Sequence, residues 1–143
     1  LAVFPSVEGF LAADDGVVRA AGLSARKLTT LRRVGEAIVT GAISEAMLEE
    51  RSSIDASLLL RGIKGVGPWT AAVILLRGLG RLDIFPGNDS SVAANLALVA
   101  GESVNVGPVV ERLGSQCGML YFCLLLARLE ARGEIGRASD VAR

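Results

Sequence analysis

Short segments, each opened by a small polar residue and closed by a glycine, follow one another along this chain. Such an order is typical of short helices, because serine or aspartate caps a first turn and glycine ends a last one. Ser24, for example, precedes an amphipathic segment with Leu28, Leu31 and Ile38 on one face, and Gly41 ends that segment. No succession of alternating strands is present. The sequence therefore predicts an all-α fold of about seven to nine helices.

The length of 143 residues predicts a single domain over residues 1–143, since domains commonly hold roughly 100–200 residues. The longest apolar run, 117–127, is shorter than the roughly 20 residues that span a bilayer, so we expect no membrane partner and a cytosolic protein. The last helix, roughly from Met119 to Ala131, is apolar on nearly all sides and is expected to be central and buried. Cys117 and Cys123 lie in this region and are expected to be buried, inert thiols.

The composition excludes several kinds of chemistry. The chain has no histidine, which removes an imidazole base, a Ser-His-Asp triad and an ordinary zinc site. Two cysteines are too few for a four-cysteine iron–sulfur cluster. The 15 basic and 15 acidic residues balance, which argues against binding a polyanion by bulk charge alone. Segment 61–82 nevertheless carries Arg61, Lys64, Arg77 and Arg81 with no acidic residue, so a local basic patch is compatible with the sequence.

Residues 58–76 contain the most informative motif of the chain. An apolar helix end is followed by a tight turn, in which Gly65 and Gly67 flank Val66, and by a new helix that Pro68 opens. The glycines allow a partner to approach the backbone, and Ile63 and Val66 are expected to point inward and hold the turn rigid. Free amides at the start of the new helix suit a nucleic-acid phosphate. The simpler alternative is a tight turn between two packed helices.

With these features, the sequence resembles the helix–hairpin–helix DNA glycosylase superfamily, and within it the 3-methyladenine DNA glycosylase II branch. An aspartate, Asp89, lies twenty residues beyond Trp69, the spacing that the resemblance requires. The stretches that carry the resemblance are 4–6, 22–27, 60–72, 79–89 and 119–126. The resemblance implies one helix–hairpin–helix glycosylase-type domain that lacks the N-terminal helices of the family.

The resemblance also implies roles for individual residues. Asp89 would be the catalytic carboxylate, and Trp69 would bind the substrate base at the position where lyase-active relatives carry a nucleophilic lysine. The DNA backbone would be bound by the hairpin residues Lys64, Gly65, Val66, Gly67, Trp69 and Thr70. The main-chain carbonyls of Arg61, Ile63 and Val66 would bind a monovalent cation, and no other cofactor is implied.

The chemistry of these residues suits that reaction. An alkylated purine such as 3-methyladenine already carries positive charge and leaves easily, so a chain without histidine needs no strong general acid. One carboxylate, Asp89, would stabilise the positively charged sugar and activate water. Trp69 would offer an aromatic face to a flipped cationic base. Without the resemblance, Asp89 is more simply a helix cap and Trp69 a core residue.

The sequence thus predicts a monofunctional glycosylase that excises alkylated purines from damaged double-stranded DNA. The first alternative is a non-enzymatic helix–hairpin–helix DNA-binding module, and the second is a helical protein-interaction domain. We expect a cytoplasmic, nucleoid-associated protein. If the helical core is incomplete, its exposed apolar surface favours self-association or pairing with a missing N-terminal segment.

Overall fold

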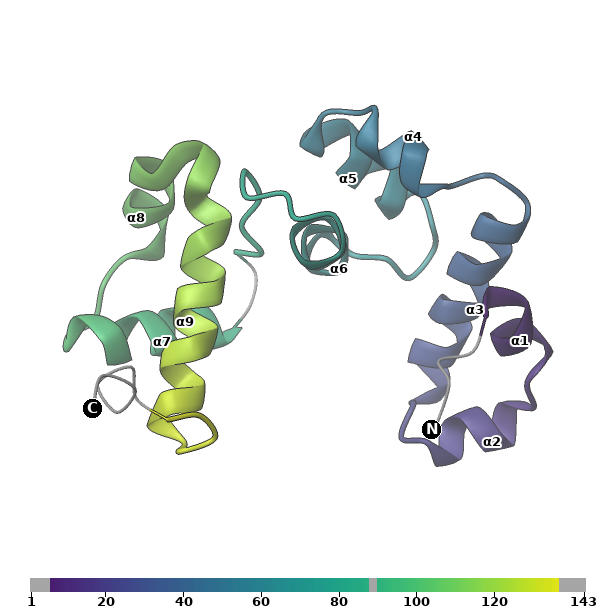
Figure 1. Cartoon of the computed structure of the whole chain (residues 1–143), viewed down its shortest axis with the longest axis horizontal. Helices are drawn as coiled ribbons and strands as arrows, with labels where there is room; N and C mark the ends of the chain where they lie inside the picture. The colour runs from purple at the N-terminus through teal and green to yellow at the C-terminus, as the bar shows by residue number, and fades with distance from the viewer. Residues whose placement is uncertain (1–5, 88–89, 137–143) are drawn as a thin grey trace. The chain divides into compact units, whose positions relative to one another are not determined.

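The computed structural model describes residues 6–87 and 90–136, and these ranges are helical with no strand (Figure 1). They hold nine α-helices, one π-helical turn and one 3₁₀ turn. The predicted all-α fold is therefore confirmed. The contacts divide the chain into two compact units, with the boundary in the sequence between Ala71 and Ala72. The single domain over residues 1–143 stays a prediction.

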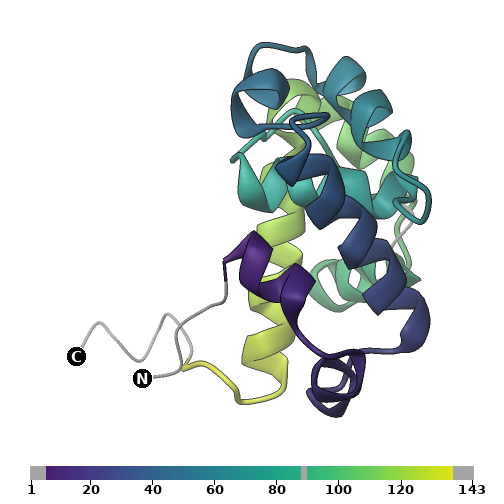
Figure 2. The ribbon, with the colours of Figure 1, turned by 90° about the vertical axis from the view of Figure 1, so that its right-hand side faces the viewer.

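Six helices begin in the first unit, and the last of them continues into the second unit. The elements of the first unit are α1 (Val7–Ala12), α2 (Asp15–Ala20), α3 (Ala25–Val39), α4 (Glu45–Glu49), α5 (Ser53–Arg61) and the start of α6 (Pro68–Val73). The predicted caps are present at Ser6 and Ser24, whose hydroxyls accept the amides of Gly9 and Lys27 at 3.0 and 3.4 Å. Helices α1 and α2 both pack against α3, and Figure 2 shows α1 beside α3 from the side.

Arg32 fastens these three helices together. Its guanidinium, on α3, donates to the carbonyls of Phe10 and Leu11 at the end of α1 and pairs with Asp15 of α2 at 2.6 Å. It also lies 5.3 Å from the centre of the Phe10 ring, within cation–π range. Arg32 therefore has a structural role that the sequence analysis did not identify.

The apolar face of α3 is only partly covered. Leu28 and Gly35 are buried, as the amphipathic pattern predicts, but Leu31 and Ile38 remain 42% and 44% exposed. Together with Val7 and Phe10 they line a shallow apolar hollow of about 230 Å³. Self-association through exposed apolar surface stays a prediction.

The second unit is built around the pair α7 and α9. Its elements are the π-helical turn η1 (Ile74–Gly78), α7 (Ser90–Ala100), α8 (Val106–Leu113), the 3₁₀ turn η2 (Gly114–Gln116) and α9 (Cys117–Ala131). Val92 and Leu96 of α7 pack with Leu124 of α9 in a buried cluster. The expectation that the last helix is wholly buried is wrong, because Met119 and Leu126 of α9 are 46% and 53% exposed.

The two cysteines of α9 differ in the same way. Cys117 is buried, as predicted, and desolvation raises the pKa of its thiol. Cys123 is exposed, so the prediction of two buried thiols is wrong at this position. An apolar sequence around a residue does not decide which side of the helix is covered.

Residues 106–131 reach the length and hydropathy of a membrane-spanning helix, with a mean hydropathy of 1.3 and 17% of their most apolar window buried. They do not form one straight helix. The backbone turns at Gly114, where φ is 51° and ψ is −122°, and α8 packs back against α9. Alone, α9 covers about 22 Å at 1.5 Å per residue, less than the hydrocarbon core of about 30 Å.

Candidate nucleic-acid interface

The hairpin between α5 and α6 is a rigid turn within the first unit. Helix α5 ends at Gly62, and the amide of Val66 donates to the carbonyl of Ile63 at 3.0 Å. Gly65, at the third position of this turn, has a φ of +107°, which residues other than glycine rarely adopt. Val66 is buried and Ile63 half-buried, so both point inward as the sequence predicts.

Helix α3 contacts the hairpin through Thr30. A Cβ atom on Gly65 would stand 2.3 Å from the Thr30 hydroxyl oxygen and 3.1 Å from the Thr30 Cβ. That hydroxyl donates to the carbonyl of Arg26 at 3.1 Å, which fixes its direction. Gly65 is thus required by the fold, through its φ and its contact with Thr30, whatever approaches from outside.

Arg33 holds the hairpin at a second point. Its guanidinium donates to the main-chain carbonyl of Lys64 at 3.1 Å. Thr30 and Arg33 are three residues apart on α3 and so lie on the same face of that helix. The side chain of Lys64 itself is exposed.

Three amides at the start of α6 remain available to a ligand. Pro68 has no N–H, and the first main-chain bond of this helix is that from Ala71 to Gly67, at 3.0 Å. The amides of Gly67, Trp69 and Thr70 meet no acceptor in the part of the chain that the structure describes. Gly67 has open space where a Cβ would stand. A phosphate oxygen is the partner that such clustered N–H groups favour.

The carbonyls of Arg61, Ile63 and Val66 suit a monovalent cation by their chemistry, since alkali ions prefer hard oxygen ligands. The Ile63 oxygen accepts the Val66 amide and keeps a second lone pair for an ion. These residues fit the group, and the cation at this place stays a prediction.

Of the two residues predicted to act on the damaged nucleotide, the structure describes one, Trp69. Trp69 is 41% exposed on α6, so its ring is available for stacking instead of being buried in the core. Asp89 lies outside the described residues. The structure describes the segment that leads toward it as far as Gly87 and the helix α7 that follows it.

The segment that leads to Asp89 is fixed to the first turn of α9. The amide of Gly118 donates to the carbonyl of Leu82 at 2.7 Å, and the Cys117 thiol lies 3.7 Å from the same oxygen. A Cβ on Gly118 would stand 2.9 Å from the Leu82 Cα and from the Ile84 oxygen. Glycine at 118 is therefore needed for this close approach, a role that the sequence analysis did not identify.

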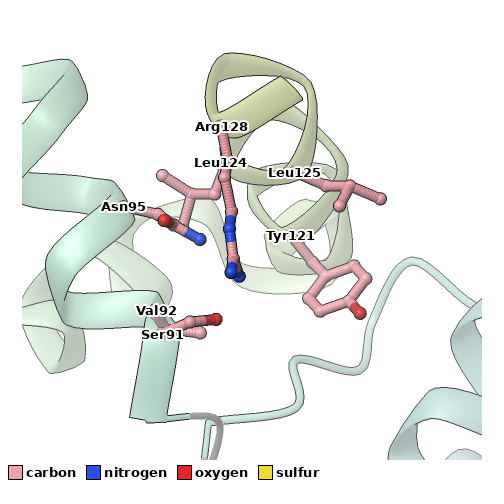
Figure 3. A pocket seen from close by; sticks show the side chains of 7 residues that line it. All are labelled: Ser91, Val92, Asn95, Tyr121, Leu124, Leu125 and Arg128. Atoms are coloured by element: carbon pink, nitrogen blue, oxygen red, sulfur yellow. The ribbon is translucent and has the colours of Figure 1, made fainter. Parts of the chain in front are cut away.

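A small pocket of about 80 Å³ lies between α7 and α9 in the second unit (Figure 3). Arg128 extends from α9 toward the start of α7, and Asn95 and Tyr121 flank its guanidinium. Ser91 lines the same pocket and is two residues beyond Asp89. The sequence analysis missed Arg128, and its only signal is one cation at the end of an apolar helix.

Known proteins resemble this chain over its greater part. DNA-3-methyladenine glycosylase 1 of Schizosaccharomyces pombe is 37% identical over 90 residues, which cover 62% of this chain and 40% of the relative. The alkylbase DNA glycosidase-like protein mag2 of the same yeast is 32% identical over 90 residues, covering 62% and 42%. The chain thus spans about two fifths of the length of these curated relatives. No family model matches the sequence.

The fold is shared as well. The solved structure of the Schizosaccharomyces pombe 3-methyladenine DNA glycosylase Mag1, in complex with abasic DNA, superposes with a TM-score of 0.72 and 26% identity. The match covers 88% of this chain and 65% of Mag1. With its helical fold and its hairpin, the chain resembles the helix–hairpin–helix DNA glycosylase superfamily, as the sequence predicts. The relatives that it matches include DNA-3-methyladenine glycosylases of a yeast and of Bacillus subtilis.

Proposed function

We propose that the protein is a monofunctional DNA glycosylase that hydrolyses the N-glycosidic bond of alkylated purines, such as 3-methyladenine, in duplex DNA. The observation that carries the proposal is the group of amides of Gly67, Trp69 and Thr70, unpaired within the described residues and held on a hairpin that α3 supports. Its relatives, named as glycosylases of alkylated bases, support it. DNA is then the partner, and the protein resides with the nucleoid in the cytoplasm.

In this proposal the hairpin binds the DNA backbone, Trp69 binds the base, and Asp89 acts on the sugar. A flipped cationic base stacks on the exposed Trp69 ring, which stabilises the extruded state. As the glycosidic bond breaks, its electron pair leaves with the base and neutralises the positive charge of the purine. The Asp89 carboxylate stabilises the positive charge that develops on the sugar and takes a proton from the attacking water. No lysine stands at position 69, so we propose hydrolysis without strand cleavage.

The test compares the wild-type chain with Asp89→Asn. We expect the wild type to release methylated bases from alkylated duplex DNA, measured by chromatography, and Asp89→Asn to lose at least about 100-fold in rate, the usual size for a positioned acid–base group. DNA affinity should stay within a few-fold. Glu102→Gln is the matched control, because Glu102 is an exposed carboxylate of the same unit, and it should leave the rate unchanged.

Two other outcomes separate the alternatives. Equal release by wild type and Asp89→Asn would show that another group performs the chemistry. DNA binding with no release by the wild type would favour a non-enzymatic DNA-binding module. That alternative keeps the hairpin and its free amides but has no working base pocket.

A further inference from the structure

A second feature for binding an anion lies beside the hairpin, within the first unit. A groove of about 520 Å³ is lined by residues from the start of α3 and from the hairpin. It is lined by Leu23, Ser24, Arg26, Lys27, Thr30, Leu31, Gly65, Trp69 and Thr70. Arg26 and Lys27 are the charged residues among them, and both are cations. The groove therefore attracts a ligand of negative charge.

The cations of α3 divide into two kinds. Arg32 and Arg33 turn toward the protein, where they bind main-chain carbonyls of α1 and of the hairpin. Arg26 and Lys27 are exposed, and no carboxylate pairs with either within residues 6–87 and 90–136. Two adjacent cations without a partner are free to neutralise phosphates.

The groove also continues into the proposed phosphate site. Trp69 and Thr70 line it, and their amides belong to the unpaired group at the start of α6. The groove is thus lined both by the two cations of α3 and by two residues of the proposed phosphate site. Leu23, Leu31 and Trp69 add apolar lining to the same groove, and such surface suits the sugars of a nucleic-acid backbone.

From this continuity we infer that the groove holds the sugar–phosphate backbone of DNA next to the phosphate bound by the hairpin, and that Arg26 and Lys27 each neutralise one phosphate. The inference rests on the proposed function for the identity of the partner. It assigns to α3 a second part of the DNA interface, which contributes affinity without reading sequence.

The test measures how DNA affinity depends on salt. The probe is a fluorescently labelled duplex oligonucleotide with a central abasic-site analogue, titrated with protein at several NaCl concentrations. The variant is Arg26→Gln with Lys27→Gln. The matched control is Arg19→Gln with Arg112→Gln, which removes two exposed cations from α2 and α8 that do not line the groove. Circular dichroism checks that both proteins are folded.

The slope of log Kobs against log salt should become shallower by about 1.8 in the groove variant, because each phosphate contact contributes about 0.9. The control should keep the wild-type slope to within about 0.5, since a cation outside the interface displaces no bound counterion. An unchanged slope in the groove variant, or an equal change in the control, overturns the groove while leaving the proposed glycosylase intact. Absence of salt-dependent binding in the wild type overturns both, and base release with Asp89→Asn then tells whether an enzyme remains.

Discussion

Gly65 and Gly67 are two residues apart in the hairpin, yet different physical requirements select them. Gly65 has a left-handed backbone and lies against Thr30, so the protein itself excludes any side chain at this position. A Cβ on Gly67 would stand in open space, so no contact among the described residues requires a glycine there. If the amide of residue 67 binds a phosphate, the requirement comes from the ligand.

This difference predicts opposite behaviour of two substitutions. Gly67→Ala should leave thermal stability unchanged and weaken DNA binding by about tenfold or more, because the added methyl group occupies the approach to the amide. Gly65→Ala should lower the free energy of unfolding by about 1–3 kcal/mol through backbone strain, and weaken DNA binding as well. Thermal denaturation and anisotropy measure the two effects. Normal DNA affinity in Gly67→Ala would contradict the assignment of this amide.

Much of the local detail at the residue scale was predictable. Ser6 and Ser24 cap helices as predicted, since a hydroxyl near free amides has few better partners. The structural role of Arg32 was not predictable, because its partners at Phe10 and Leu11 are more than twenty residues away in sequence. The sequence does not show which long basic side chains contact the rest of the protein and which remain exposed.

At the scale of elements, the segment 82–84 depends on the first turn of α9. This segment lies so close to Gly118 that even one methyl group on Gly118 would clash with backbone atoms of Leu82 and Ile84. Backbone cannot move aside as a flexible side chain can. The chain runs from this segment to Asp89, so a shift of the segment would act on the part of the sequence that carries the proposed catalytic carboxylate.

We therefore predict that Gly118→Ala slows base release more than it weakens DNA binding. The methyl group should displace the segment that leads to Asp89, at a cost of about 1–3 kcal/mol in stability from overpacking. Single-turnover excision, DNA affinity and thermal denaturation give the three readouts. Gly107→Ala, on α8 with ordinary space around its Cβ, is the control. Equal losses of excision and DNA binding would contradict this separation.

Helix existence was predictable at this scale, whereas helix ends and distortions were less so. The last helix begins at Cys117, two residues before the predicted start, because the 3₁₀ turn η2 leads directly into it. The helix opened by Pro68 changes to a π-helical turn at Ile74, which no local sequence signal indicates. Leu75 and Leu76 of this turn are both buried.

At the scale of the whole molecule, the balanced charge limits how DNA can be bound. The 15 cations and 15 anions leave no net attraction, so affinity must come from a few placed groups. For the wild type we predict a slope of log Kobs against log salt of about −2.7, equivalent to roughly three cations, which we assign to Lys64, Arg26 and Lys27. A slope steeper than about −5 would show that further cations reach the DNA.

The fold class was predictable because periodicity and caps act locally, but burial was not. Hydrophobic residues make up 51% of the chain, and part of them remains exposed in the described residues. Met119, Cys123 and Leu126 are exposed on a helix whose composition suggested complete burial. Sequence composition states how much apolar surface exists, whereas tertiary contacts decide which part is covered.

The contact from Arg33 to the Lys64 carbonyl has a consequence for how this hairpin can diversify. Arg33 recognises an atom that every amino acid possesses, so the support it gives survives any replacement at position 64. Selection is then free to change the exposed side chain at 64, in charge or in length, without rebuilding the turn. With position 65 restricted to glycine and position 64 open to substitution, the charge at the tip of the hairpin can vary between related chains while its backbone stays the same.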